Sequence, residues 1–286
     1  MNDITRSILR TIQISISDKE LQKICELIYL RAGIVLTSQK KDMVQNRLSR
    51  RLRTLGIISY SEYIQRLEEN PNSDEWQAFI NALTTNLTSF FRESYHFPIL
   101  LEHARKSRGG YNVWCSAAST GEEPLSIAMT LNEALGRNPA TGPRVWATDI
   151  DTDVLQKARN GIYQLSDLNG LTLKQKEDYF LRRSSPTGDL VKVKKELLLD
   201  ICYQQLNLLA QNWDIPAPFD AIFCRNVMIY FDQKTQEQLM RRFAKMLKPD
   251  GIVFVGHSEH FGNMAGPFRL RGQSVYSLDK EISWGK

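Results

Sequence analysis

The spacing of apolar residues predicts helices throughout the first 85 positions. Ser17 and Glu20 form a capping-box pattern at the start of the first predicted helix. A second helix is predicted over about 39–55, and a third runs from a capping pattern at Ser59 to just before Pro71. A fourth carries an apolar stripe at i, i+3, i+4 and i+7 spacing. That stripe consists of Trp76, Phe79, Ile80 and Leu83.

Beyond residue 110, short apolar runs rich in β-forming residues alternate with segments of helical spacing. The predicted strands are 111–116, 144–148, about 201–206, 219–224 and 251–256, with 268–278 as a hairpin partner at the sheet edge. The predicted helices are 122–135, about 154–160 and 234–247. This alternation predicts an α/β fold with a mostly parallel, doubly wound sheet.

The 111–151 stretch has the order of half a nucleotide-binding unit: strand, small-residue loop, helix, and a strand that ends in Asp149. Small loop residues let a ligand approach the backbone, and a carboxylate after the second strand is placed to accept hydrogen bonds from ribose hydroxyls. Gly121 is the only glycine of the loop, whereas the dinucleotide fingerprint needs three. Glu122 and Glu123 at the helix start repel a pyrophosphate. The pattern favours a phosphate-free adenosine ligand with a positive centre, such as S-adenosylmethionine; an ordinary, well-capped α/β turn is the alternative.

Composition is typical of a soluble globular protein long enough for two domains: 286 residues, 42% hydrophobic and 24% charged. No run approaches about 18 apolar residues and the polar N-terminus lacks an apolar signal core, so a cytoplasmic protein without membrane insertion is expected. The scattered cysteines contain no CxxC pair and are expected to be reduced core residues. His257 and His260 lack the i, i+4 spacing of a zinc helix, so no metal is expected.

The helix predicted over 39–55 has an asymmetric charge. Its apolar residues form one stripe on a helical wheel, and most of its basic residues fall on a different face. Two interpretations stay open: a solvated face, or a docking surface for an acidic partner such as nucleic acid or an acidic helical protein. The basic residues are Lys40, Arg47, Arg50 and Arg51, with Arg53 further round the helix.

Polar side chains also gather where a ligand site is expected. TTNLTSFFRE (84–93) joins the helical and α/β parts, and CRNVMIYFD (224–232) directly follows a predicted buried strand. Carboxyl ends of strands are where ligands bind in open α/β sheets. The alternative for 84–93 is an ordinary polar linker. The alternative for 224–232 is a capped strand end without a ligand. Asn207 follows the preceding predicted strand in the same way. The candidates are therefore Asn86, Thr88, Arg92, Asn207, Arg225, Asn226 and Tyr230.

Taken together, these segments resemble the chemotaxis receptor methyltransferases, the CheR family, which methyl-esterify glutamates on bacterial chemoreceptors. The resemblance covers nearly the whole chain, and its most specific parts are SAASTGEEP and FCRNVMIYFD. Further matching segments are ELIYLRAGIVL, KKDMVQNRLSRRLR, NALTTNLTSFFRE, ATDIDTDVL, QLNLL and FVGHSE. The resemblance implies an N-terminal helical receptor-docking domain (1–85) and an S-adenosylmethionine-dependent methyltransferase domain (86–286) with a small antiparallel β insert (164–199).

The resemblance also implies roles for single residues. Arg92 and Tyr230 are the expected helpers of methyl transfer, and the basic helix is the expected docking element for the cytoplasmic domain of transmembrane chemoreceptors. Cofactor contacts are expected from Asn86, Thr88, Arg92, Glu123, Asp149, Asn207, Leu208, Arg225 and Asn226.

The β insert shows a turn signal, SSPTGD, followed by LVKVKK, which alternates like a strand. In part of the family the insert binds a peptide at the receptor's C-terminus through a loop that is often glycine-rich. Here the loop contains only Gly188, so a structural hairpin without a partner remains the alternative.

A glutamate carboxylate has a reference pKa of about 4.3, so it is ionised at neutral pH and needs no general base. Arg92 is expected to orient it by a charge-assisted hydrogen bond. Two other functions remain open: a nucleic-acid methyltransferase, and a non-catalytic module that senses S-adenosylmethionine. The first should carry an Asn/Asp-Pro-Pro-aromatic motif where this chain reads RNVMIYF, so no nucleic-acid partner is expected.

Overall fold

The structure is a computed structural model that describes residues 15–107, 109–137, 142–183, 189–259, 261 and 266–279. The polar N-terminus, the turn expected around Gly188 and His260 lie outside these residues. By its internal contacts the chain divides into two units, Met1–Thr85 and Asn86–Lys286, each described here by itself.

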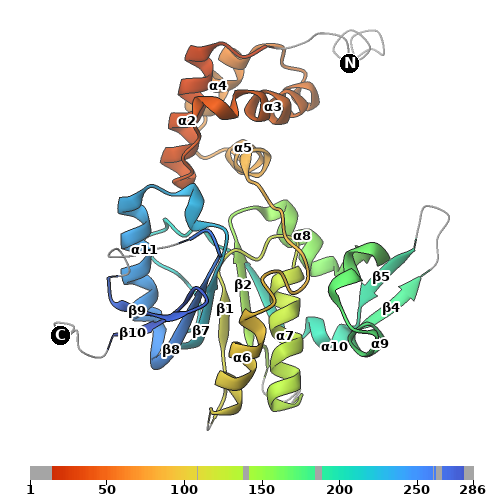
Figure 1. The fold of residues 1–286 in the computed structure, drawn as a ribbon. Helices are drawn as coiled ribbons and strands as arrows, with labels where there is room; N and C mark the ends of the chain where they lie inside the picture. The colour runs from red at the N-terminus through yellow and green to blue at the C-terminus, as the bar shows by residue number, and fades with distance from the viewer. Residues whose placement is uncertain are drawn as a thin grey trace. The chain divides into compact units, whose positions relative to one another are not determined.

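Unit 1 is all-helical in its described part, as expected (Figure 1). At the start of its first helix, Glu20 N–H donates to Ser17 Oγ while Ser17 N–H donates to the Glu20 carboxylate, so the predicted capping box is present. The elements are α2 (Asp18–Ala32), the 3-10 turn η1 (Ser38–Lys40), α3 (Lys41–Leu55), α4 (Tyr60–Glu69) and α5 (Glu75–Leu83).

Beside its apolar stripes, unit 1 contains an ion pair between a buried carboxylate and a half-buried arginine. The Arg51 guanidinium binds both Glu75 carboxylate oxygens, with Nε 2.8 Å from Oε1, and the Tyr63 hydroxyl donates to Oε1 at 2.7 Å. Burial would raise the pKa of Glu75, but these partners hold it below its usual value. Helices α3, α4 and α5 are therefore joined by one satisfied carboxylate.

Unit 2 contains a seven-stranded sheet in the order β6-β2-β1-β7-β8-β10-β9 (Figure 1). The first five strands in that order run parallel, and β10 is antiparallel to both β8 and β9. The doubly wound, mostly parallel sheet and its edge hairpin are confirmed. The strands are β1 (Val113–Cys115), β2 (Val145–Asp149), β6 (Ile201–Gln205), β7 (Phe219–Cys224), β8 (Leu247–Val255), β9 (Phe268–Gly272) and β10 (Val275–Leu278).

Side-chain alternation along the buried strands produces two cores, one on each face of the sheet. On β7, Phe223 belongs to one core, with Leu125, and Ile222 belongs to the other, with Phe243. The first core is covered by α6 (His96–Arg105), α7 (Glu122–Leu135) and α8 (Thr152–Asn160). The second is covered by α11 (Gln233–Met246).

A second, three-stranded antiparallel sheet confirms the expected β insert. Tyr163 and Phe180 of this sheet pack edge-on against Phe90, which anchors the insert to the rest of unit 2. Its elements are β3 (Ile162–Gln164), η3 (Leu165–Gly170), α9 (Leu173–Tyr179), β4 (Phe180–Arg183), β5 (Leu190–Val193) and α10 (Lys195–Leu198), with β5 in the middle.

Within the described ranges, no helix is both long and apolar enough to cross a bilayer.

Candidate functional site

The candidate residues of unit 2 gather at the carboxyl edge of its parallel strands. Since β1, β2, β7 and β8 are parallel neighbours, the segments that follow them emerge side by side. The 86–93 segment lies against the same edge, because Asn86 bonds to Ser119 in the loop after β1 and to Asp151 after β2. Phe91 N–H also donates to Ser126 Oγ on α7 (Glu122–Leu135).

Asp149 is the last residue of β2, as predicted, and it is buried. Its Oδ2 accepts a hydrogen bond from Ser119 N–H at 2.8 Å, and Oδ1 accepts one from Asp151 N–H at 3.0 Å. Burial raises the pKa of Asp149 to about 6, although these backbone donors favour the ionised form. Each carboxylate oxygen can accept a further bond, so both remain able to receive the hydroxyls of a ribose.

Asn86 connects the 86–93 segment to that carboxylate's surroundings. Its Nδ2 donates to Asp151 Oδ2 at 2.7 Å, and its backbone carbonyl accepts from Ser119 Oγ at 3.0 Å. Asp151 also caps α8 by accepting from the backbone N–H groups of Asp153 and Val154. The Asn86 position is therefore fixed by two residues that flank Asp149.

The loop after β1 owes its glycine to packing. Gly121 has φ 102, and a Cβ there would lie 2.7 Å from Tyr163 Oη and 2.9 Å from the Ala158 Cβ. The Tyr163 hydroxyl donates to the neighbouring Thr120 carbonyl at 2.7 Å. At Gly121, α8 and the insert fill the space that a side chain would occupy, so packing accounts for this glycine. Close approach of a ligand to the loop backbone stays a prediction.

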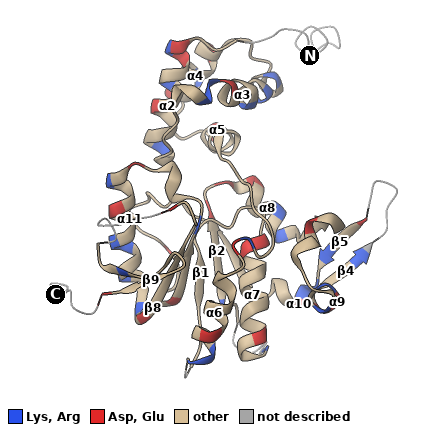
Figure 2. Ribbon diagram, viewed as in Figure 1, with Lys and Arg blue, Asp and Glu red and all other residues tan. Residues whose placement is uncertain are grey.

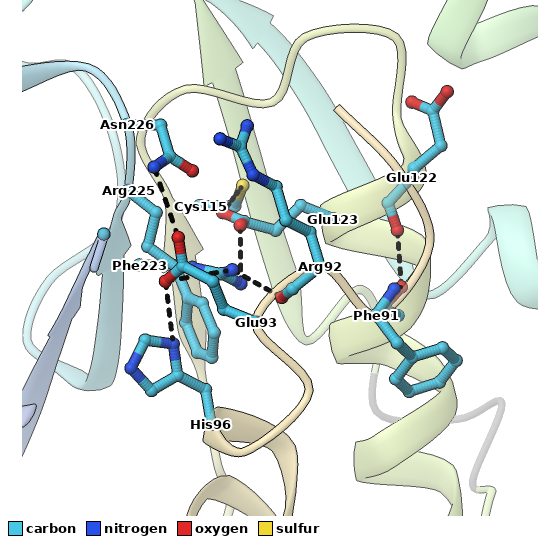
Figure 3. Close-up of polar contacts among 12 residues, drawn as sticks. Phe91, Arg92, Glu93, His96, Cys115, Glu122, Glu123, Phe223, Arg225 and Asn226 are labelled. Carbon is cyan, nitrogen blue, oxygen red and sulfur yellow. Dashed lines mark hydrogen bonds and ion pairs between the residues drawn. The ribbon is translucent and has the colours of Figure 1, made fainter. Parts of the chain in front are cut away.

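Arg225 follows β7 directly, and its side chain is 1% exposed. Arg225 forms ion pairs with two carboxylates: Nη1 lies 2.9 Å from Glu123 Oε2, and Nη2 lies 3.5 Å from Glu93 Oε2. The contact of Nη1 with Glu123 is an ion pair but not a hydrogen bond, because its N–H groups are not aligned with the oxygen. Nη2 also donates to the Arg92 carbonyl (Figure 3). Burial raises the pKa of Glu123, against the effect of Arg225 and the Cys115 thiol that donates to it. One buried cation thus joins the start of α7 to the 86–93 segment.

Glu93 is a second junction at this edge, with a left-handed φ of 51. It accepts hydrogen bonds from His257 N–H at 3.1 Å and from Asn226 Nδ2 at 3.3 Å. Burial would raise the pKa of Glu93, but Arg225 and these donors hold it below its usual value. Burial, together with Arg225, lowers the pKa of the adjacent His96 to about 4, so His96 is neutral at neutral pH.

Asn226 also has left-handed backbone, with φ 57, a conformation that asparagine tolerates better than most residues. Its N–H donates to Glu259 Oε2 at 2.8 Å. The same carboxylate accepts from Gly256 N–H at 2.6 Å and Met228 N–H at 2.8 Å. Burial raises the pKa of Glu259 even though these donors favour the ionised form.

The remaining candidates lie on the same edge with fewer constraints. Arg92 Nη1 donates to the Leu87 carbonyl at 2.8 Å, and the guanidinium points away from the Arg225 cluster (Figure 3). Thr88 is half-buried in the same segment, and Tyr230 is half-buried at the end of the 3-10 turn η4 (Met228–Tyr230). Asn207 follows β6, where Leu206 N–H bonds to the Asp149 carbonyl.

Two of the predicted cofactor contacts, Leu208 and Asn207, also make structural contacts within the protein. Leu208 is buried in the second core, and its carbonyl accepts from Arg242 Nη1 at 3.0 Å. Asn207 Oδ1 accepts from Leu209 N–H at 2.9 Å, which closes an Asx turn.

Sequence reasoning assigned no role to Glu93 or Glu259, although both stood in segments that carried the resemblance. Each is a carboxylate in a short segment outside the predicted helices and strands, Glu93 in the junction after the fourth helix and Glu259 just after the strand 251–256. That context signals a buried polar partner without revealing which segment supplies it.

Basic residues recur along α3 (Figure 2), but their side chains are not all exposed. Arg51 is committed to Glu75, and Arg47 Nη1 donates to the carbonyls of Leu83 and Thr84. These two residues lie away from the apolar stripe on the helical wheel, yet both are held by other residues of unit 1. The exposed members are Lys40, Arg50 and Arg53.

The donor set fits S-adenosylmethionine. A buried carboxylate after β2 suits a ribose diol, and Glu122 and Glu123 in the first turn of α7 oppose a phosphate. Glu93 and Glu123 bring two carboxylates to one Arg225 guanidinium, an arrangement that suits a ligand with a positive centre. Among the residues that the structure describes, no group of three or more His, Cys, Asp or Glu side chains is arranged to hold a metal ion.

Comparison with known proteins gives matches over both units. A family model described as "CheR methyltransferase, SAM binding domain" matches residues 86–277, and one described as "CheR methyltransferase, all-alpha domain" matches residues 19–84. The chemotaxis protein methyltransferase of Salmonella typhimurium (strain LT2) is 57% identical over 271 residues, which cover 95% of this chain and 94% of the relative. That of Escherichia coli (strain K12) is 55% identical with the same coverage. Chemotaxis protein methyltransferase 2 of Pseudomonas aeruginosa (strain PAO1) is 46% identical over 263 residues, 91% of this chain and 92% of the relative.

Proposed function

The chain belongs to the CheR family of S-adenosylmethionine-dependent methyltransferases, and we propose that it methylates glutamate side chains of bacterial chemoreceptors in the cytoplasm. The products would be glutamate methyl esters and S-adenosylhomocysteine, and the reaction would serve sensory adaptation. Support for the substrate comes from the relatives, which are named chemotaxis protein methyltransferases.

The observation that carries the cofactor assignment is the buried Asp149 carboxylate at the end of β2. It would hold the ribose hydroxyls. Asn86, beside it, and Asn226, at the end of β7 on the other side of β1, would offer polar groups to the rest of the molecule. Arg225 is engaged by protein groups, so at the site it acts mainly by holding Arg92 and Glu93. Thr88, Glu123, Asn207 and Leu208 complete the proposed cofactor set.

Bound S-adenosylmethionine supplies an electrophilic methyl group. The chain's own task is to bring an already ionised glutamate carboxylate into line with it and to exclude part of its water. Arg92 and Tyr230 are the proposed orienting groups. A single charge-assisted hydrogen bond from Arg92 orients the carboxylate, whereas a full bidentate pair would weaken it as a nucleophile.

Receptor docking is assigned to unit 1. Lys40, Arg50 and Arg53 expose their charges along η1 and α3 and are free to meet an acidic helical surface. Arg47 and Arg51 would support that face by holding α3 against the rest of the unit.

The β insert is proposed to bind a receptor C-terminal peptide. In its sheet β5 lies in the middle, so β3 and β4 are the outer strands, and an extended peptide pairs with an outer strand by β-addition.

The proposal is tested by incubating the protein with methyl-labelled S-adenosylmethionine together with receptor membranes, DNA or RNA. Label is expected on receptor protein alone. Label on nucleic acid would replace the substrate class, and cofactor binding with no label on any of the three would indicate a sensor module.

A further inference from the structure

The segment that carries Arg225, Asn226 and Tyr230 depends on a carboxylate from another part of the chain. Glu259 lies in the turn after β8, which is closed by a hydrogen bond of 2.9 Å from its own N–H to the Gly256 carbonyl. That turn directs the Glu259 side chain back toward the end of β7.

The Glu259 carboxylate accepts three backbone N–H groups from two segments. Oε2 takes Gly256 N–H at 2.6 Å and Asn226 N–H at 2.8 Å, and Oε1 takes Met228 N–H at 2.8 Å. Glu259 is 4% exposed, so these bonds replace water for both partners. Two of the three donors belong to the 225–230 segment, including the residue with left-handed backbone.

Gly256 shows how closely the two segments meet. A Cβ at this position would lie 2.5 Å from Asn226 Nδ2 and 2.8 Å from Glu259 Oε2. No other residue type fits without moving the contact apart.

We propose that Glu259 is a positioning residue for methyl transfer: it fixes the backbone of Asn226 and of η4, and thereby the cofactor contact at Asn226 and the side chain of Tyr230. The inference rests on the proposed function, because it assigns the 225–230 segment to the cofactor site. Glu259 itself need not touch either reactant.

Glu259→Gln tests this role with little change of shape. An amide has one acceptor oxygen, so it cannot serve both carboxylate positions, and its NH2 group must face at least one backbone N–H. We expect a loss of at least about tenfold in S-adenosylhomocysteine affinity by calorimetry, a lower kcat, and faster hydrogen exchange at Asn226 and Met228.

Two further variants separate positioning from general stability. Asp220→Asn alters another buried carboxylate on β7, at the opposite end of the strand, where it accepts Asn112 N–H at 2.7 Å and pairs with Lys248. This control should lose stability with near-parental affinity. Gly256→Ala should reproduce the Glu259→Gln affinity loss, because its methyl group pushes the same contact apart from the other side.

Parental affinity in a folded Glu259→Gln protein would overturn the inference, and so would an equal affinity loss in Asp220→Asn. If the parent protein binds no cofactor, the proposed function fails, while the exchange rates still report whether Glu259 holds the segment: unchanged exchange in Glu259→Gln overturns the inference independently.

Discussion

At the scale of single residues, the site depends on buried carboxylates with different environments. Asp149 receives two backbone N–H groups, Glu93 and Glu123 share one arginine, and Glu259 receives three backbone N–H groups. Only Asp149 combines backbone support with a position at the end of the strand next to β1, which is where a ribose is expected.

Asp149→Ala is expected to weaken S-adenosylhomocysteine binding about ten- to a hundredfold, the cost of roughly 1.5–3 kcal/mol for a charge-assisted hydrogen bond. Binding should also depend on pH. Ribose hydroxyls favour the ionised carboxylate, whose pKa is about 6 in the free protein. Affinity should therefore be constant above about pH 7 and fall as pH drops through 6, with proton release on binding.

Calorimetry between pH 5 and pH 7.5 measures this dependence, with Asp149→Asn as the control that should flatten it. A parental profile that is already flat, together with unchanged affinity in Asp149→Ala, would remove Asp149 from the site.

Tyr230→Phe is expected to lower kcat about two- to tenfold, the value of one neutral hydrogen bond, with little change in cofactor affinity. Arg92→Ala should lower kcat more, because the lost bond is charge-assisted. Arg159→Ala is a matched control: Arg159 Nη2 donates to the Tyr203 carbonyl at 3.0 Å, much as Arg92 Nη1 donates to Leu87. Steady-state rates with receptor as substrate measure these effects. A parental kcat in both Arg92→Ala and Tyr230→Phe would refute the orienting roles of the two residues.

At the scale of elements, the exposed charges of η1 and α3 can be separated from those that hold the helix in place. Reversing Lys40, Arg50 and Arg53 to glutamate should slow receptor methylation strongly while leaving S-adenosylhomocysteine binding intact. Attraction between exposed charges is screened beyond about 8 Å at physiological salt. The parental rate should therefore fall as salt rises, and the variant's slope should be shallower.

Reversal of the exposed Lys234, Arg241 and Lys245 on α11 changes the net charge equally and serves as the control. If both triple variants lose the same activity, net charge alone explains the effect. If the variant on η1 and α3 keeps a parent-like rate, its basic face is a solvated surface and not a docking site.

Arg51→Ala should act on stability instead. It leaves the buried Glu75 with the Tyr63 hydroxyl but without its cation. Breaking a buried pair costs about 3–5 kcal/mol, and the partial exposure of Arg51 places the expected loss near the lower value. Chemical denaturation followed by helix signal measures it. An unchanged midpoint would show that the pair adds nothing to unit 1, while Arg53→Ala should have little effect.

The elements that the sequence predicted well are those specified by neighbours along the chain. The capping box at Ser17 and Glu20 fixes the start of α2, and the apolar run Phe219–Cys224 is β7 from end to end. The contacts that were not predicted join distant segments: Arg51 meets Glu75 24 residues away, and Arg225 meets the 92–93 pair across most of unit 2. A helical wheel shows which side of the helix a residue faces, but tertiary packing determines which residue it contacts there.

At the scale of the whole molecule, the order of the strands explains why the site forms. β1 and β7 lie at the centre of the sheet, with β2 next to β1, so the segments after them are neighbours although the helices and the insert separate them in sequence. Alternating strands and helices predicted such an edge, and Asp149 and Arg225 were found on it. The place of β10 between β8 and β9 was not specified by any local pattern, because strand order depends on the whole packing.

The most direct measurement is the chemistry of the labelled product. The protein is incubated with methyl-labelled S-adenosylmethionine and a chemoreceptor cytoplasmic domain, and the labelled receptor is then treated with mild alkali, which hydrolyses carboxylate esters. We expect the label to be released as methanol, and to be absent when the receptor's methylatable glutamates are replaced by alanine. Alkali-stable label, or label that persists in the alanine-substituted receptor, would contradict methyl transfer to glutamate carboxylates.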